Sequence, residues 1–266
     1  MHQILFKIPS FHIGSHVFGN FYIYTYGVVL SIAFALSLLF TIQRAKKRGV
    51  STETITDLSI LLLIAGVVGS RFLFVIEEWD DYVGKWASVF NIREGGLSLH
   101  GGLIAGLLVG GWYIRARKLD FWKVVDILAP GIAIGMGIGR IGCFFNGCCL
   151  GIPTRLPWGV VFKDNPMFFG PRHPTQLYEM ILDFIIAGIL IFGFRNAKPG
   201  SAFLWFCILI GISRFFIEFL RADAIPMGPL SFVQWLSLLI VGIASFYLIR
   251  LRRQQHAHVS SSARKG

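Results

Sequence analysis

Long apolar stretches constrain the fold of this chain more than any other feature of its sequence. A helix needs about 20 predominantly apolar residues to cross roughly 30 Å of hydrocarbon. Seven stretches approach or meet this requirement, at residues 22–42, 55–76, 99–114, 121–138, 175–194, 202–220 and 230–249. We therefore predict an all-α polytopic membrane protein in which residues 1–266 form a single transmembrane domain of seven helices.

The amount and placement of charge agree with a membrane protein. Charged residues make up 15% of the chain, against roughly a quarter in soluble domains. The net charge is +11, but many basic residues cluster directly after apolar stretches, as the positive-inside rule describes. Such clusters contain Arg44, Lys46, Lys47, Arg48, Arg115, Arg117, Lys118, Lys123, Arg195, Lys198, Arg250, Arg252, Arg253, Arg264 and Lys265. We expect a lipid bilayer as the environment and no nucleic-acid partner, because no basic stripe with interleaved aromatic residues is present.

The basic cluster at residues 44–48 predicts the orientation in the membrane. It places the C-terminal end of the first helix in the cytoplasm, so alternation puts the N-terminus outside and the C-terminus inside. The acidic residues of the second-to-third loop then fall outside: Glu77, Glu78, Asp80, Asp81 and Glu94. We expect an external N-terminal arm (1–21), a small external cap loop (140–173) and a basic cytoplasmic tail (250–266).

Glycines repeat every four residues on two of the predicted helices. They are Gly102, Gly106 and Gly110 on the third helix, and Gly131, Gly135 and Gly139 on the fourth. In membranes, small residues at this spacing let helix backbones approach closely. We expect these glycines to serve helix packing.

Charged side chains within the predicted spans are costly in lipid and therefore indicate function. Arg214, Glu218 and Arg221 share one face of the sixth helix. One glutamate cannot neutralise two arginines, so an anionic ligand near the outer helix end would account for the remaining charge. A structural ion pair is the competing interpretation.

Arg140 follows the glycine run, where the fourth predicted helix leaves the membrane. Its planar donors suit phosphate oxygens, although an interfacial arginine that snorkels to water is the alternative.

Two further polar residues lie near the outer ends of predicted helices. His100 precedes Gly101-Gly102 at the start of the third helix, where glycines would let a ligand approach the backbone. The positive field of a helix N-terminus disfavours imidazolium, so a neutral ring there could accept a proton. A hydrogen-bonded structural histidine is the simpler interpretation of His100 alone. Tyr26 is equally ambiguous, because aromatic residues gather at membrane interfaces.

The segment from Pro171 to Glu179 holds more polar groups than the start of a helix requires. Gln176 and Glu179 share a helix face, and Asp183 lies one turn deeper on that face. We assign Arg172, Gln176 and Glu179 to substrate binding.

Three of the four cysteines, Cys143, Cys148 and Cys149, lie close together in the sequence, and Cys207 lies apart. A metal could bind the group, but no spaced second pair is present. The pattern favours a disulfide or small-residue packing over zinc, and gives a thiol nucleophile no special support. We predict no metal and no cofactor.

Taken together and in this order, five segments resemble the signature blocks of bacterial prolipoprotein diacylglyceryl transferases. They are Tyr26-Gly27, His100-Gly101-Gly102-Leu103, residues 139–147 (GRIGCFFNG), residues 172–179 (RHPTQLYE) and residues 214–221 (RFFIEFLR). The resemblance implies a seven-helix enzyme of the bacterial inner membrane with its active site toward the external side. Such enzymes move the diacylglyceryl group of phosphatidylglycerol onto the lipobox cysteine of a prolipoprotein signal peptide and release glycerol phosphate. This is the first step of lipoprotein maturation.

The same resemblance implies residue roles. By motif, the family's essential histidine falls on His100, its active-site tyrosine on Tyr26, and its phosphate-handling arginines on Arg140 and Arg214. Further binding positions fall on Asn146, Gly147 and Gly151. Our hypothesis makes His100 the base, with Tyr26 as partner or alternative. Glu218 would orient Arg214, and Arg221 and Glu218 would contribute to substrate binding.

This chain departs from many family members, which carry Asn at the position of Cys143 and Glu at that of Cys148. Roles of those two polar side chains therefore do not transfer. Three other classes remain open on the residues alone. They are a transporter or channel lined by the intramembrane charges, a non-catalytic membrane scaffold, and a thiol-redox enzyme built on Cys148-Cys149.

Overall fold

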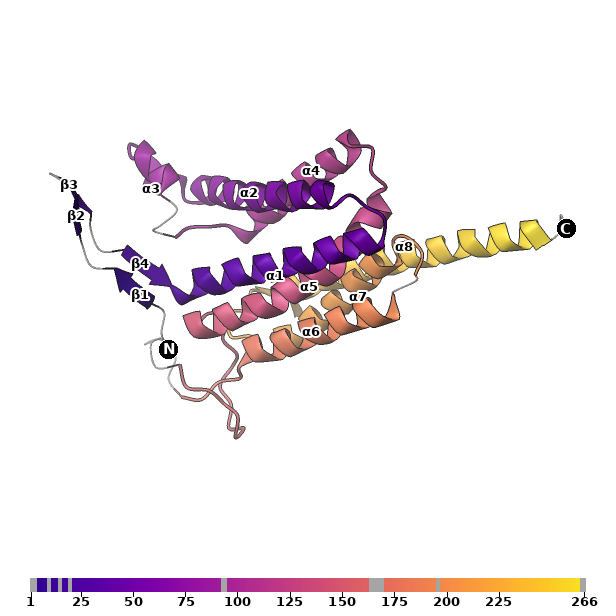
Figure 1. The fold of residues 1–266 in the computed structure, drawn as a ribbon. Coiled ribbons are helices and arrows are strands. Elements are labelled where there is room, and N and C mark those ends of the chain that lie inside the picture. The colour runs from indigo at the N-terminus through magenta and orange to yellow at the C-terminus, as the bar shows by residue number, and fades with distance from the viewer. Residues whose placement is uncertain are drawn as a thin grey trace. The chain divides into compact units, whose positions relative to one another are not determined.

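The computed structural model describes residues 4–8, 11–13, 16–18, 21–91, 95–162, 170–194 and 197–263. Glu94, Arg195, Arg264 and Lys265 lie outside the described residues, as do parts of the predicted arm and cap loop. The described part contains eight α-helices (Figure 1), and the predicted helical class is confirmed. The chain divides into two compact units. The first comprises Met1–Leu39 with Leu128–Gly266, and the second comprises Phe40–Ile127.

A long helix overlaps each of the seven predicted apolar stretches. These helices are α1 (Thr25–Lys47), α2 (Thr52–Glu77), α4 (Leu99–Ala116), α5 (Phe121–Asn146), α6 (Thr175–Gly193), α7 (Ser201–Glu218) and α8 (Phe232–Ala263). The short helices are α3 (Trp79–Tyr82) and the 3-10 helix η1 (Trp86–Phe90). The described strands form three antiparallel pairs: β1 (Ile4–Ile8) with β4 (Phe21–Tyr24), β2 (Phe11–Ile13) with β3 (His16–Phe18), and β5 (Pro226–Met227) with β6 (Leu230–Ser231).

Six of the described helices are long and apolar enough to cross a membrane: α1, α2, α5, α6, α7 and residues 232–253 of α8. Many of their large apolar side chains are exposed, among them Phe192, which is 84% exposed. Such a surface suits lipid, because lipid solvates apolar groups and cannot solvate ions. The chain is therefore a multi-pass membrane protein. α4, which carries His100, several glycines and Arg115, is not one of the six.

The predicted end of the fourth helix at Ile138 is wrong, because α5 continues to Asn146. The glycines around residues 135–142 suggested an early end, since glycine is a poor helix former. Close packing on α1 overrides this preference: a Cβ on Gly135 would lie 3.4 Å from Ser37, and one on Gly142 would lie 3.1 Å from Tyr26. Helix α5 ends before Gly147, whose φ of +69° is the left-handed conformation that commonly closes a helix.

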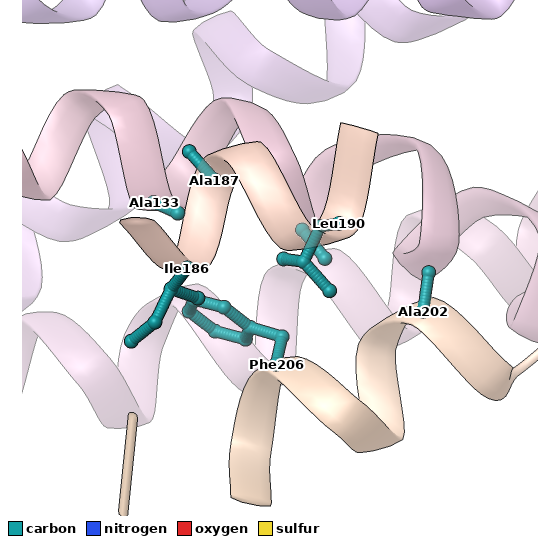
Figure 2. Close-up of a cluster of buried hydrophobic side chains, with 7 residues drawn as sticks. Ala133, Ile186, Ala187, Leu190, Ala202 and Phe206 are labelled. Atoms are coloured by element: carbon teal, nitrogen blue, oxygen red, sulfur yellow. The ribbon is translucent and has the colours of Figure 1, made fainter. Parts of the chain in front are cut away.

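The core of the first unit lies where α5, α6 and α7 meet (Figure 2). Small side chains let the helices approach, and larger ones fill the remaining space. Figure 2 shows Ile186 of α6 beside Phe206 of α7. The buried cluster contains Ala129, Ala133, Ile186, Ala187, Leu190, Ala202 and Phe206. α1 joins α5 through the hydroxyl of Ser37, which donates to the carbonyl of Gly131 over 2.6 Å. This packing fixes the helices that carry the polar groups described below.

In the second unit, α2 and α4 pack against each other in antiparallel directions. A Cβ on Gly101 would lie only 2.2 Å from the carbonyl oxygen of Gly69, and one on Gly102 would lie 2.4 Å from the hydroxyl oxygen of Ser70. The two backbones therefore touch at these glycines. Our expectation that Gly101 and Gly102 leave room for a ligand is wrong, because α2 occupies that space.

Arg71 of α2 holds the segment that leads from α2 to α4. Its side chain is 7% exposed. The guanidinium donates to the carbonyls of Ser88, Val89, Gly95 and Gly96 at 2.7 to 3.0 Å. Five donors in a planar group are well matched to several carbonyls of one loop. The sequence prediction did not single out this residue.

Candidate active site

One buried carboxylate in the first unit gathers arginines from other segments. Glu179, in the first turns of α6, is 2% exposed. Its Oε2 lies 3.0 Å from Nε of Arg140 on α5 and 3.8 Å from Nη1 of Arg221. Its Oε1 accepts a hydrogen bond from Nη1 of Arg214 on α7. The structure thus brings together four residues that the sequence assigned to substrate binding.

The cluster concentrates charged groups in a largely buried place. Arg140, Arg214 and Arg221 have side chains that are 18%, 24% and 10% exposed, so all three are largely removed from solvent. Glu179 supplies one negative charge, and Asp223, 54% exposed, supplies a second at Arg221. Two further buried carboxyl groups interact with the cluster, Glu218 with Arg214 and Asp183 with Arg140. Guanidinium groups in a site of low dielectric attract anions strongly, and their paired donors match phosphate or carboxylate oxygens. Three guanidiniums on one shared carboxylate are an arrangement that could bind the oxygens of an anionic ligand.

Arg221 keeps its charge at every accessible pH. Burial alone would lower its pKa, but hydrogen bonds from Nε and Nη2 to the Asp223 carboxylate outweigh that effect and raise the pKa above its usual range. These two bonds, at 2.8 and 2.6 Å, form a bidentate pair that also fixes the plane of the guanidinium. The Arg221 guanidinium is therefore a permanent positive charge with a fixed orientation in the cluster.

Glu179 accepts a hydrogen bond from Arg214, and Glu218, the residue that we expected to orient Arg214, interacts with the same guanidinium electrostatically. Glu218 is 5% exposed and accepts a hydrogen bond from the Ser231 hydroxyl at 3.0 Å. Sequence spacing favoured Glu218 because it lies one turn from Arg214 on the same helix. The partner on α6 could not be recognised from spacing within a single helix.

The turn that follows α5 is held by two fully buried side chains at the start of α6. Thr175 and Gln176 are both 0% exposed. The Thr175 hydroxyl donates to the carbonyl of Cys149 at 2.7 Å, and Nε2 of Gln176 donates to the carbonyl of Cys148 at 2.6 Å. The turn also contains Gly147 with φ of +69° and Cys149 with φ of +60°. Gln176 was predicted to bind substrate; its amide nitrogen is bonded to the protein backbone, and its buried amide oxygen has no hydrogen-bond partner among the described residues.

Gly151 and Arg172 join three separate segments of the chain beside this turn. A Cβ on Gly151 would lie 2.6 Å from the carbonyl oxygen of His173 and 2.9 Å from that of Leu220, so only glycine fits. Nη1 of Arg172 donates to the Gly151 carbonyl at 3.0 Å, and its backbone pairs with Val160. An isolated antiparallel β-bridge between Gly151 and Arg221 connects these loop segments to the arginine cluster. Both residues shape the loops around the site.

The two candidate bases belong to different units. Tyr26, the second residue of α1, is 37% exposed and packs beside Gly142 of α5 in the first unit. His100, the second residue of α4, is exposed and belongs to the second unit. Asn146, the last residue of α5, is also exposed. Tyr26 therefore belongs to the same unit as Arg140. The position of His100 is defined only relative to other residues of the second unit.

The apolar helices and the buried cluster of arginines around Glu179 define a multi-pass membrane protein with a polar site among its helices. Comparison with known proteins then identifies the family. The family model of prolipoprotein diacylglyceryl transferase matches residues 13–250, and this chain belongs to that family.

Curated relatives agree along almost the whole chain. A phosphatidylglycerol–prolipoprotein diacylglyceryl transferase of Clostridium tetani is 34% identical over 242 residues, which cover 87% of this chain and 95% of the relative. Relatives of the same name from Clostridium botulinum and Clostridioides difficile are each 36% identical, covering 91% and 84% of this chain and 98% and 90% of their own lengths. The resemblance found in the five sequence segments is confirmed.

Proposed function

We propose that this chain transfers the diacylglyceryl group of phosphatidylglycerol to the lipobox cysteine of prolipoprotein signal peptides, the first step of bacterial lipoprotein maturation. Family membership across residues 13–250 is the observation that carries the proposal. The curated relatives bear the same activity in their names. Neither the family model nor the curated relatives favour the transporter or channel alternative. Their names describe a transferase.

The reaction makes demands that the cationic cluster can meet. The cysteine sulfur bonds to the terminal glyceryl carbon of the lipid, the carbon–oxygen bond to phosphate breaks, and glycerol phosphate leaves. The thiol proton passes to a base, because the thiolate is the nucleophile. Negative charge grows on the leaving phosphate, and fixed guanidinium groups stabilise that charge without having to reorganise. No additional oxidant or reductant is needed.

Arg140, Arg214 and Arg221 are the proposed phosphate ligands, and Glu179 is the residue that positions them. Their contacts with a single buried carboxylate hold three guanidiniums close together despite their mutual repulsion. Asn146, which is exposed, is proposed to contact substrate directly. Gly147, Gly151, Arg172 and Gln176 would support binding through the loops that they shape. Glu218 would act through its bond with Ser231.

His100 is the proposed base, with Tyr26 as partner or alternative. His100 lies in the first turn of α4 and is exposed, and an imidazole ring nitrogen is a common proton acceptor in catalysis. Tyr26 packs against the helix that carries Arg140. A tyrosine in this place could pass a proton between the thiol and the base.

We further propose that α4 is a seventh span. The N-terminal arm would be external and the C-terminal tail cytoplasmic, and the active site would face outward from the bacterial cytoplasmic membrane. Basic residues at the ends of α1 and α4 support this orientation. Membrane-impermeant maleimide applied to intact cells should label a cysteine introduced at the exposed Lys85 and should spare one at the exposed Arg117. The reverse pattern would refute the orientation.

The activity is tested with the purified chain in phosphatidylglycerol-containing liposomes, supplied with a lipobox peptide. We expect the peptide to gain the mass of one diacylglyceryl group, with an equal amount of glycerol phosphate released. An Arg140→Gln variant should lose both products, and Arg117→Gln, on the exposed end of α4, should retain them. Solute flux without peptide modification would overturn the proposal in favour of a transporter.

A further inference from the structure

Three cysteines converge at the end of α5, beside the arginine cluster. Cys143 lies in the last turns of α5, and Cys148 and Cys149 lie in the turn that follows. Their three Sγ atoms all lie within 4.8 Å of one another, and none of the three is in a disulfide. Three thiolates bound to one Zn²⁺ ion lie about 3.8 Å apart, because each Zn–S bond is about 2.3 Å long. The spacing fits ligands of one ion after small side-chain adjustments.

We propose that Cys143, Cys148 and Cys149 form a binding site for one thiophilic d¹⁰ cation, with Zn²⁺ the first candidate. Three soft sulfur ligands select such metals over Mg²⁺ or Ca²⁺, which prefer oxygen. A set of three protein ligands leaves the fourth tetrahedral position open, as in zinc sites that bind water or substrate. The proposal does not rest on the transfer reaction proposed above, and metal binding is measured without it.

Hydrogen bonds hold the backbone of these cysteines in one conformation. Cys148 donates its amide hydrogen to the carbonyl of Cys143 at 3.2 Å, which closes the turn between them. The carbonyls of Cys148 and Cys149 accept hydrogen bonds from the fully buried Gln176 and Thr175. These bonds fix both cysteines from the far side, as partners in the outer shell of a metal site do. The arrangement orients the thiols before any ion arrives.

Cys149 occupies an unfavourable backbone conformation. Its φ of +60° lies in the left-handed region, which is unfavourable for an ordinary L-residue, and a plain packing role would be met equally well by glycine. Non-glycine residues keep such a conformation where the surroundings impose it, and these positions gather at functional sites. The side chain of Cys149, which is partly buried, is therefore the reason for a cysteine at this position.

The charge around the cluster suits a metal–thiolate group. Zn²⁺ with three thiolates carries a net charge of −1. Arg140 lies one turn before Cys143 on the same helix, and Arg221 pairs with Gly151, two residues after Cys149. Positive guanidiniums beside a metal–thiolate centre offset its negative charge.

The proposal is tested by metal binding to the full-length chain in detergent micelles. Reduced, metal-stripped protein is titrated with Co²⁺ alone, because the visible absorption of Co²⁺ reports tetrahedral thiolate ligation. Zn²⁺ is then added to compete for the site. We expect one Co²⁺ per chain, displaced by one equivalent of Zn²⁺. Cys148→Ala should weaken binding about 100-fold or more, since even outer-shell changes cost 10- to 100-fold. Cys207→Ala, which alters the cysteine on α7 outside the group, should bind as the unchanged chain does.

Two outcomes would overturn the site. One is equal Co²⁺ binding by the unchanged chain and by the Cys143→Ala/Cys148→Ala/Cys149→Ala variant. The other is a disulfide among the three cysteines, found by mass spectrometry in protein purified without reductant, together with no metal in the same sample. If the triple variant fails to fold, Gln176→Glu supplies a second test. It removes the donor to the Cys148 carbonyl but leaves all three thiols, and we expect metal affinity to fall about 10-fold or more.

Discussion

Nε of Arg140 lies 3.0 Å from Oε2 of Glu179, and this contact joins two helices at the centre of the candidate site. The same carboxylate also contacts Arg214 and Arg221. A single anion thus sets the spacing of three cations on three separate segments. Removing it would affect both the stability of the bundle and the binding of an anionic substrate, and the two effects can be measured separately.

Glu179→Gln should destabilise the protein, because three guanidiniums would lose their shared counter-charge. Breaking a buried ion pair by removing one partner costs about 3 to 5 kcal/mol. Because the arginines are partly exposed, we expect a loss of about 3 kcal/mol in the free energy of unfolding. The thermal midpoint in detergent should fall, and transfer activity should drop at least tenfold. Glu53→Gln, which alters an exposed residue in the first turn of α2, is the matched control. Equal midpoints for the two variants would refute the central role of Glu179.

Arg140→Lys separates charge from geometry at the proposed phosphate site. Lysine keeps the positive charge but loses the planar paired donors, so a bidentate contact would be lost. We expect kcat/KM for phosphatidylglycerol to fall about 10- to 100-fold, a loss of roughly 1.4 to 2.7 kcal/mol in transition-state binding. Arg115→Lys, at an exposed position on α4, should leave the rate unchanged. A near-normal rate for Arg140→Lys would argue against a bidentate contact.

His100→Ala should abolish most of the activity if this residue is the base. A positioned general base contributes about 10²- to 10⁴-fold, so a loss of that size is expected in kcat. Tyr26→Phe preserves the ring that packs beside Gly142 and removes only the hydroxyl. The pH dependence of kcat/KM then distinguishes the two roles, because only loss of the true base removes the acidic limb. Full activity in His100→Ala would transfer the assignment to Tyr26.

Gly151→Ala should disrupt the meeting point of three segments. The added methyl group would lie 2.6 Å from the His173 carbonyl oxygen and 2.9 Å from that of Leu220, and neither backbone atom can move freely. Overpacking of this kind costs about 1 to 3 kcal/mol. Gly188→Ala on α6, where a Cβ would meet nothing within 4 Å, should be neutral or slightly stabilising. Thermal unfolding of the two variants side by side provides the measurement.

Arg71→Ala should loosen the segment between α2 and α4. Four carbonyls would lose their charged donor, and each hydrogen bond to a charged group contributes about 1.5 to 3 kcal/mol in a buried site. Limited proteolysis should then cut between residues 83 and 98 much faster than in the unchanged chain. Arg71→Lys should give only partial protection, since one ammonium group cannot reach all four acceptors. An unchanged cleavage rate in Arg71→Ala would contradict the role of this residue.

The helices could be predicted from the sequence because the requirement for a long apolar run is local. The end of α5 could not, since it depends on the contact of Gly135 and Gly142 with α1. The same limit applies to the site. Arg140, Arg214 and Glu179 were each recognisable as misplaced charges in an apolar setting, but their pairing depends on how α5, α6 and α7 pack. Arg71 was missed because an arginine near a helix end is usually explained by contact with water.

The acidic residues on α6 have a consequence for how the protein is made. Glu179 and Asp183 are each 2% exposed, and a carboxylate inside a span costs about 3 kcal/mol during membrane insertion. The countercharge for Glu179 includes Arg214, on the helix that is synthesised next. Arg140, on the helix that is synthesised before α6, contacts the same carboxylate. We therefore expect the insertion machinery to release α6 into the lipid together with α5 and α7, whose arginines neutralise Glu179. Biogenesis of this protein would then depend on the order of synthesis as well as on hydrophobicity.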